Sequence, residues 1–118
     1  MKNLILAIFL GLGAQMALCA DSSVTGTISE LDTATGLGGA PGNGDLRVFI
    51  NGVSSFCPLN GGDATWAFIN ANDANYKAAV ATLSMAYATG KQTTIYTRPG
   101  VITGAGTYCQ ISWIQVHG

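Results

Sequence analysis

The sequence predicts a small domain built mainly from β-strands, with one helix, in the order β-β-β-α-β-β. Three observations support this fold class. Short runs rich in Val, Ile, Thr and aromatic residues alternate with clusters of Gly, Asn and Asp, as is typical of strands joined by turns. One Ala-rich segment has helical spacing instead. A chain of 118 residues has room for one such domain.

The first twenty residues have the layout of a secretory signal peptide. Lys2 precedes an uninterrupted apolar run, and the segment ends in small residues at Cys19 and Ala20. The run is too short to span about 30 Å of hydrocarbon. We predict cleavage after Ala20, which would leave residues 21–118 as a single exported bacterial domain, secreted or periplasmic. The alternative is a lipoprotein acylated at Cys19, but Leu18 stands where that motif has a small residue.

The composition excludes two broad classes of protein. Only 9% of the residues are charged, against roughly 25% in an ordinary soluble domain. The net charge of −1, which becomes −2 when Lys2 leaves with the signal peptide, does not suit a protein that binds phosphate backbones. Hydrophobic residues make up 48% of the chain, which is the reverse of a disordered composition. The sequence therefore predicts a folded domain with no nucleic-acid partner.

Three strands are predicted in the first half of the exported chain. Residues 22–31 alternate as one strand, residues 45–53 form a second, and residues 64–70 form a third. The Gly-rich connection over residues 32–44 resembles a phosphate-binding loop in composition only. A phosphate loop needs a Lys-Ser/Thr ending or a helix after it, and a strand follows here. We therefore interpret it as a long hairpin connection.

The one predicted helix is about sixteen residues long and follows the third strand. Asn72 and Asp73 offer an N-cap, and Gly90 ends the helix as a C′ residue. The intervening Ala residues have high helix propensity. The residues predicted to face the core follow helical spacing and are Tyr76, Ala79, Val80, Leu83 and Tyr87.

Two strands complete the predicted order. Residues 92–98 are rich in β-branched side chains, residues 99–106 are predicted to be a loop, and residues 107–117 form the last strand. A five-stranded barrel with its helix between the third and fourth strands is the OB-fold arrangement. The sequence therefore predicts a small OB-fold-like barrel.

Two cysteines remain after removal of the signal peptide, Cys57 and Cys109. In an exported domain of this size they predict one disulfide, which would close a loop of about fifty residues. The rival interpretation is a metal site. The chain has only one His, His117, and no Cys-x-x-Cys spacing, so we favour the disulfide.

The second half of the chain also carries a resemblance to a known family. Its motifs are the aromatic strand around Trp66, the segment Ala-Tyr-Ala-Thr-Gly-Lys-Gln-Thr-Thr-Ile-Tyr over residues 86–96, and the Cys-Gln-Ile-x-x-Ile pattern over residues 109–114. Residues 66–116 resemble the binding (B) subunits of pentameric A–B bacterial toxins of the subtilase-cytotoxin and typhoid-toxin type, and a set of small exported proteobacterial proteins. The resemblance implies an OB-fold barrel with one disulfide, no enzymatic activity and, in the toxins, a ring that binds glycans. The chain departs from those subunits in its shorter tail after the fourth strand.

The residues that could support catalysis or bind a metal are few and scattered. His117 is one residue from the C-terminus, where chains usually fray, so a Ser-His-Asp triad has no well-placed base. No loop has the alternating acidic ligands of a calcium site. We predict no catalytic residue, no metal and no cofactor. The acidic side chains that could form carboxylate pairs are all expected at strand ends or turns and are Glu30, Asp32, Asp45, Asp63 and Asp73.

Aromatic side chains are the better candidates for contact with a ligand. Their rings stack on sugars and bury a large area at low entropic cost. We predict Tyr96, Arg98 and Tyr108 as the contact residues, because an Arg beside aromatic rings can bind an acidic sugar carboxylate while the ring stacks. The alternative role of Arg98 is to solubilise the end of its strand. Trp66 and Trp113 are predicted to fill the barrel instead.

Two function hypotheses from different classes follow. The first is an exported recognition module that binds a glycan or another exported protein, either alone or as a toxin-B-like subunit in a homo-oligomer. The second is a periplasmic structural or interaction protein whose barrel holds no small-molecule ligand. A glycan screen distinguishes them.

The signal-peptide assignment predicts where the mature chain begins. Mass spectrometry of secreted or periplasmic protein should give a chain that starts at Asp21, because the charge, the apolar run and the small-residue ending occur in the required order. Material that starts at Met1, or that is acylated at Cys19, would contradict it.

Overall fold

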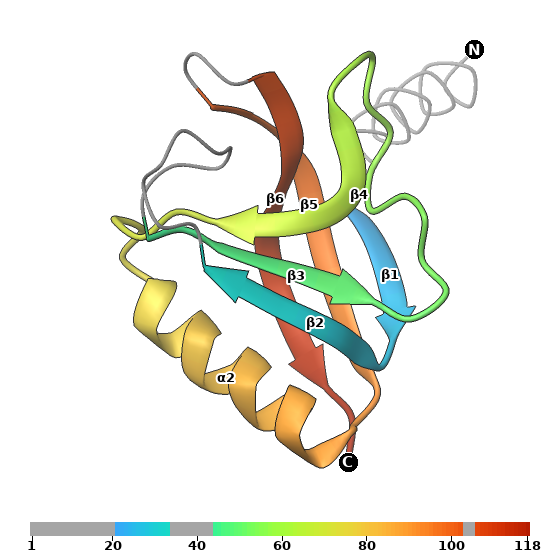
Figure 1. Cartoon of the computed structure of the whole chain (residues 1–118), viewed down its shortest axis with the longest axis vertical. Coiled ribbons are helices and arrows are strands. Elements are labelled where there is room, and N and C mark those ends of the chain that lie inside the picture. The colour runs from blue at the N-terminus through green and yellow to red at the C-terminus, as the bar shows by residue number, and fades with distance from the viewer. Residues whose placement is uncertain (1–20, 34–43, 103–105) are drawn as a thin grey trace, which may run out of the picture.

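The computed structural model describes residues 21–33, 44–102 and 106–118, in which one sheet and one helix are seen (Figure 1). The mainly-β class with a single helix is confirmed within these residues, and the sheet is not closed. The predicted signal peptide and most of the Gly-rich connection lie outside the described residues. The elements are β1 (Ser22–Gly26), β2 (Ile28–Thr33), β3 (Leu46–Ile50), β4 (Asp63–Ile69), α2 (Tyr76–Thr89), β5 (Thr93–Ile102) and β6 (Gly106–Val116).

The six strands are hydrogen-bonded in the order β1-β5-β6-β4-β3-β2. All neighbouring pairs are antiparallel except β4 and β6, which are parallel. The two end strands, β1 and β2, follow each other directly in the chain (Figure 1). In the described part of the chain, no helix is long and apolar enough to cross a membrane.

The single strand predicted over residues 22–31 is two strands, so the sheet has six strands where five were expected. The break falls at Thr27, because β1 pairs with β5 while β2 pairs with β3. At the break the backbone N–H of Asn51 donates to the Thr27 carbonyl at 2.9 Å. A Cβ on Gly26 would lie 2.6 Å from the side chain of Ile50, so only glycine allows this close crossing.

The loop predicted over residues 99–106 is mostly strand. β5 continues to Ile102 and β6 begins at Gly106, so the two strands form a long antiparallel ribbon. Pro99 does not end β5, because β1 pairs with β5 only as far as Thr97. Beyond that point one side of β5 is a free edge, where a proline is tolerated.

Helix α2 begins later than predicted and ends where predicted. Its N-cap is Asn75 rather than Asn72 or Asp73, and the Asn75 side chain makes no capping hydrogen bond. The Asp73 carboxylate instead accepts the backbone N–H of Asn75 at 2.8 Å and forms a turn ahead of the helix. Gly90 ends the helix in the left-handed region with φ of 65°, as its sequence position predicts.

The core lies between one face of the sheet and α2. The helix packs against β2 and β6 through residues spaced four and three apart, Ala79, Leu83 and Ala86. Tyr87 was expected on this face. It follows the buried Ala86 in the helix, so its side chain points away from the core and is exposed. The strands contribute alternate residues to the core, which include Leu46, Val48, Ile50, Ala67, Ile69, Ile95, Cys109 and Ile111.

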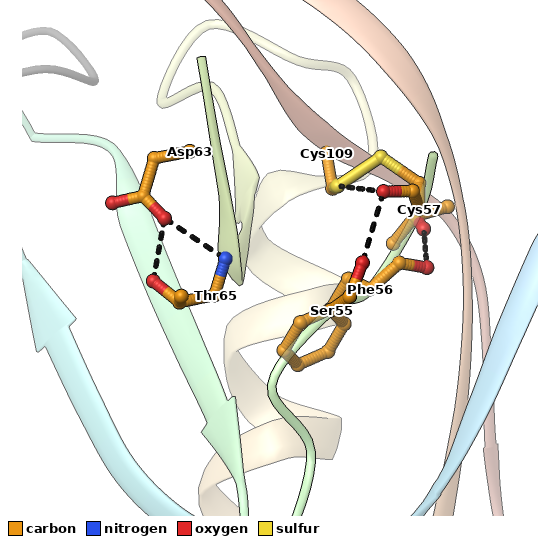
Figure 2. Close-up of a disulfide and its surroundings, with 7 residues drawn as sticks. Ser55, Phe56, Cys57, Asp63, Thr65 and Cys109 are labelled. Atoms are coloured by element: carbon orange, nitrogen blue, oxygen red, sulfur yellow. Dashed lines mark hydrogen bonds between the residues drawn. A yellow bond between two sulfur atoms is a disulfide. The ribbon is translucent and has the colours of Figure 1, made fainter. Parts of the chain in front are cut away.

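The predicted disulfide between Cys57 and Cys109 is confirmed in the structure, with the two Cα atoms 5.8 Å apart (Figure 2). It joins the connection between β3 and β4 to β6 inside the core. The neighbouring Phe56 is fixed by its backbone, whose N–H donates to Ala64 at 2.8 Å and whose carbonyl accepts from the Thr97 hydroxyl at 3.0 Å. The disulfide therefore secures a segment that has no regular secondary structure.

Loss of the disulfide should lower the free energy of unfolding by about 4 kcal/mol, the chain-entropy value for a loop of this length. Urea unfolding should show this difference in free energy between the oxidised protein and the reduced protein. It should show the same difference between the oxidised protein and a Cys57→Ala/Cys109→Ala variant. Equal stability of oxidised and reduced protein would contradict it.

Candidate binding face

The side of the sheet opposite the core residues, which we call the outer face, carries the candidate contact residues. In a strand, neighbouring side chains point to opposite faces. Ile95 and Cys109 point into the core, so their strand neighbours Tyr96 and Tyr108 point to the outer face. Arg98 pairs across the ribbon with Gln110 and is exposed. The structure thus places all three predicted contact residues on one face, with Tyr108 diagonal to Arg98 in the register.

A β-bulge brings Trp113 to the same face. Tyr96 lies opposite Trp113 and Thr97 lies opposite Ile111, so Ser112 is an extra residue in β6. The bulge reverses the alternation of β6, and Trp113 points outward with 62% of its surface exposed. The expectation that Trp113 fills the core is therefore wrong, because a bulge shifts every following side chain to the other face.

Polar contacts hold the bulge in place. The Ser112 hydroxyl donates a hydrogen bond to the Asp21 carboxylate and lies 3.2 Å from the Tyr96 carbonyl oxygen. The Arg98 guanidinium also donates to Asp21, at 3.3 Å. The Ser112 hydrogen bond, helped by the charge of Arg98 and opposed by desolvation, holds the pKa of Asp21 below its ordinary value. Asp21 is therefore an ionised acceptor at neutral pH.

These residues surround a hollow of about 380 Å³, the outer hollow, lined by Asp21, Tyr96, Trp113 and Gln115. Its aromatic rings offer flat apolar surfaces. Its carboxylate accepts hydrogen bonds, and its amide both donates and accepts them. This combination complements a small ring that is apolar on its faces and carries hydroxyl groups on its edge.

A second aromatic cluster lies on the outer face over β3, β4 and the start of β6. The ring of Tyr108 stacks on Trp66 with centroids 4.7 Å apart, and the Arg47 guanidinium lies 5.3 Å from the same Trp ring. Arg47 is paired with Asp32 at 2.8 Å. Trp66 is buried, as predicted, although it lies outside the core cluster. One face of the Tyr108 ring packs on the buried Trp66, and Tyr108 itself is half-buried, so the cluster is closed at Trp66 and partly open at Tyr108.

Asp63 lies at the edge of that cluster and hydrogen-bonds to Thr65, as Figure 2 shows. Its carboxylate accepts from the Thr65 hydroxyl at 2.6 Å, from the Thr65 backbone N–H at 2.9 Å and from the Trp66 indole N–H at 3.1 Å. These hydrogen bonds lower the pKa of Asp63, and the bond from the Thr65 hydroxyl has the largest effect. The Asp63 carboxylate therefore orients Trp66, and its other hydrogen bonds stabilise the local turn at Thr65.

The other acidic side chains are similarly engaged in local contacts. Asp45 accepts the Ala71 backbone N–H at 2.6 Å. Glu30 lies beside Asp32, and a hydrogen bond between the two raises the pKa of Glu30. His117 contacts Thr94 at 2.7 Å. Among the described residues, no group of three or more His, Cys, Asp or Glu side chains could hold a metal ion.

Two members of the outer hollow were not predicted, Asp21 and Gln115, and Trp113 was assigned to the core. The sequence of β6 holds a partial signal for this. Cys109 and Ile111 are apolar at odd positions, while Ile114 and Val116 are apolar at even positions. A strand with both sets facing the core must contain an extra residue between them.

No protein-family model matches the chain, and no curated protein or solved structure is significantly similar to it. The resemblance to toxin binding subunits stays a prediction.

The bulge predicts that the two tryptophans differ in solvent access. In a Trp66→Phe variant, the remaining Trp113 should emit at long wavelength and be quenched efficiently by acrylamide, because its ring is exposed. In a Trp113→Phe variant, the remaining Trp66 should be poorly quenched. Similar quenching in both variants would rule out the assigned faces.

Proposed function

We propose that this chain is an exported, non-catalytic recognition module that binds a glycan in the outer hollow. The exposed ring of Trp113 beside Tyr96 carries the proposal. A large aromatic side chain on a sheet face leaves apolar surface in water unless a ligand covers it. Sugars cover such rings with the C–H groups of their pyranose face.

The polar groups of the outer hollow favour a sugar over a purely apolar ligand. Asp21 is held in place by Ser112 and Arg98, so its remaining lone pairs are pre-oriented for ligand hydroxyl groups. Gln115 lines the same hollow and supplies a donor as well as an acceptor. Fixed polar groups beside an aromatic platform lower the ordering cost of binding.

Arg98 and Tyr108 extend the proposed site along the ribbon. The Arg98 side chain is 62% exposed and uses one of its nitrogens on Asp21, so further guanidinium donors face solvent. Tyr108 lies diagonally beyond it in the register. We assign Tyr96 and Trp113 to the first sugar ring, and Arg98 and Tyr108 to a second residue of an oligosaccharide.

An OB-fold-like barrel is part of the same proposal. It is supported by the consecutive strands β1 and β2 at opposite ends of the strand order, which correspond to one bent first strand of a barrel. The disulfide supports export, because disulfides persist in oxidising compartments. Assembly into a toxin-like ring stays a prediction that the native mass would test.

The proposal is tested on a glycan array with the folded, oxidised chain. We expect Trp113→Ala to weaken binding to the retained glycan at least tenfold, and Tyr96→Ala to weaken it as well. Tyr87→Ala is the matched control, because Tyr87 is an exposed aromatic residue on α2. Arg98→Ala and Tyr108→Ala test the second sugar position separately.

If no glycan is retained by folded protein, or if Trp113→Ala binds as tightly as the natural chain, the proposal fails. The first result would favour the alternative of a structural or interaction protein without a small-molecule ligand. Hydrolase activity that stays with the natural chain through purification would also overturn the non-catalytic assignment.

A further inference from the structure

Trp113 forms a wall of two hollows. Besides the outer hollow, it borders a crevice of about 400 Å³ between α2 and β6, which we call the helix crevice. Ser112 also lines the crevice, so the bulge that exposes Trp113 forms the ridge between the two spaces. The other apolar or small residues of the crevice include Ile69, Ala78, Ala79, Thr82, Ile111 and Ile114.

The two hollows differ in chemistry. The outer hollow contains the ionised carboxylate of Asp21 and the amide of Gln115. None of the described residues that line the helix crevice has an ionisable side chain, and its floor is formed by the nearly buried Ile69, Ala79 and Ile111. The crevice persists because α2 and its N-cap present short side chains toward it, those of Asn75, Ala78, Ala79 and Thr82.

We infer that the ligand of this site is a glycoside with a short apolar aglycone. The inference rests on the proposed function: the sugar ring lies on Trp113 and Tyr96, and the aglycone crosses the ridge at Ser112 into the helix crevice. A polar and an apolar space that share the wall formed by one exposed ring match an amphiphilic molecule of that shape.

The size of the two spaces distinguishes this ligand from a macromolecule. Stable protein partners each cover about 800 Å² of surface. The site consists of two small hollows of about 380 and 400 Å³ around one Trp side chain. Such paired small spaces suit a sugar ring and a few carbon atoms.

The test compares methyl and hexyl β-D-glucosides, and the corresponding galactosides, in titrations followed by NMR. Complete burial of a methylene group improves affinity by about fourfold, and half burial by about twofold. The hexyl glycoside of the sugar that binds should therefore have a Kd at least about tenfold lower than the methyl glycoside. Shifts of the Ile111 and Ile114 resonances should appear with the hexyl glycoside only.

Ala78→Phe fills the crevice and should abolish the gain from the hexyl chain while it preserves binding of the methyl glycoside. Ala81→Phe is the matched control, because Ala81 is exposed on the same helix and does not line the crevice. Thermal unfolding verifies that both variants fold, and Thr82→Leu replaces Ala78→Phe if that variant does not.

The outcomes separate the inference from the proposed function. Equal affinity for methyl and hexyl glycosides, or a hexyl gain that survives in Ala78→Phe, overturns the inference and leaves glycan binding intact. A native dimer that shows no hexyl gain also overturns it, since a second copy would then cover the crevice. If neither the glycosides nor any array glycan binds, the proposed function fails and the inference fails with it.

Discussion

One continuous backbone segment hydrogen-bonds to both halves of the sheet, and the rest of the structure depends on that constraint. Residues 22–26 pair with β5 and residues 28–33 pair with β3, although these partners are three positions apart in the strand order. The sheet must therefore curl (Figure 1), with the core on its inner side and the outer face on its convex side. Gly26 makes the crossing sterically possible, because the side chain of Ile50 occupies the space that any Cβ would need. The disulfide adds a covalent link across the same enclosed core.

The candidate site depends on the β-bulge at Ser112 in β6. If Ser112 took a regular place in the ladder instead of bulging, the strand would keep its alternation, and Trp113 would face inward in place of Ile114. The unpaired residue brings its hydroxyl to Asp21, and that carboxylate in turn holds Arg98. The bulge thus accompanies an exposed aromatic ring and adds a hydroxyl to the polar groups beside it. Residues from three separate parts of the chain meet at the outer hollow.

Local patterns predicted the parts of this molecule that are determined locally. Gly90 ends the helix because its position needs a left-handed backbone, and the strands follow the alternation of their apolar residues. The break at Thr27 was not predicted, because the alternation of Val24, Gly26 and Ile28 continues across it and the partner strands change there. Pro99 led to the prediction of a loop because proline has no backbone N–H to donate to a neighbouring strand. It is tolerated in β5 because the pairing of β1 with β5 ends at Thr97, a fact that the sequence alone does not reveal. For the candidate site, residue type led to Tyr96 and Arg98 as candidates, whereas Asp21 and Gln115 required the ribbon register to be known.

Both arginines of the chain are paired with aspartates, Arg47 with Asp32 and Arg98 with Asp21. The electric field of each cation is therefore largely cancelled within a few ångströms, and the chain as a whole carries little net charge. A partner that approaches the outer face would meet no long-range attraction. Association should then proceed without electrostatic steering, and its rate should change little with salt. Selectivity among partners would reside in how long each stays bound.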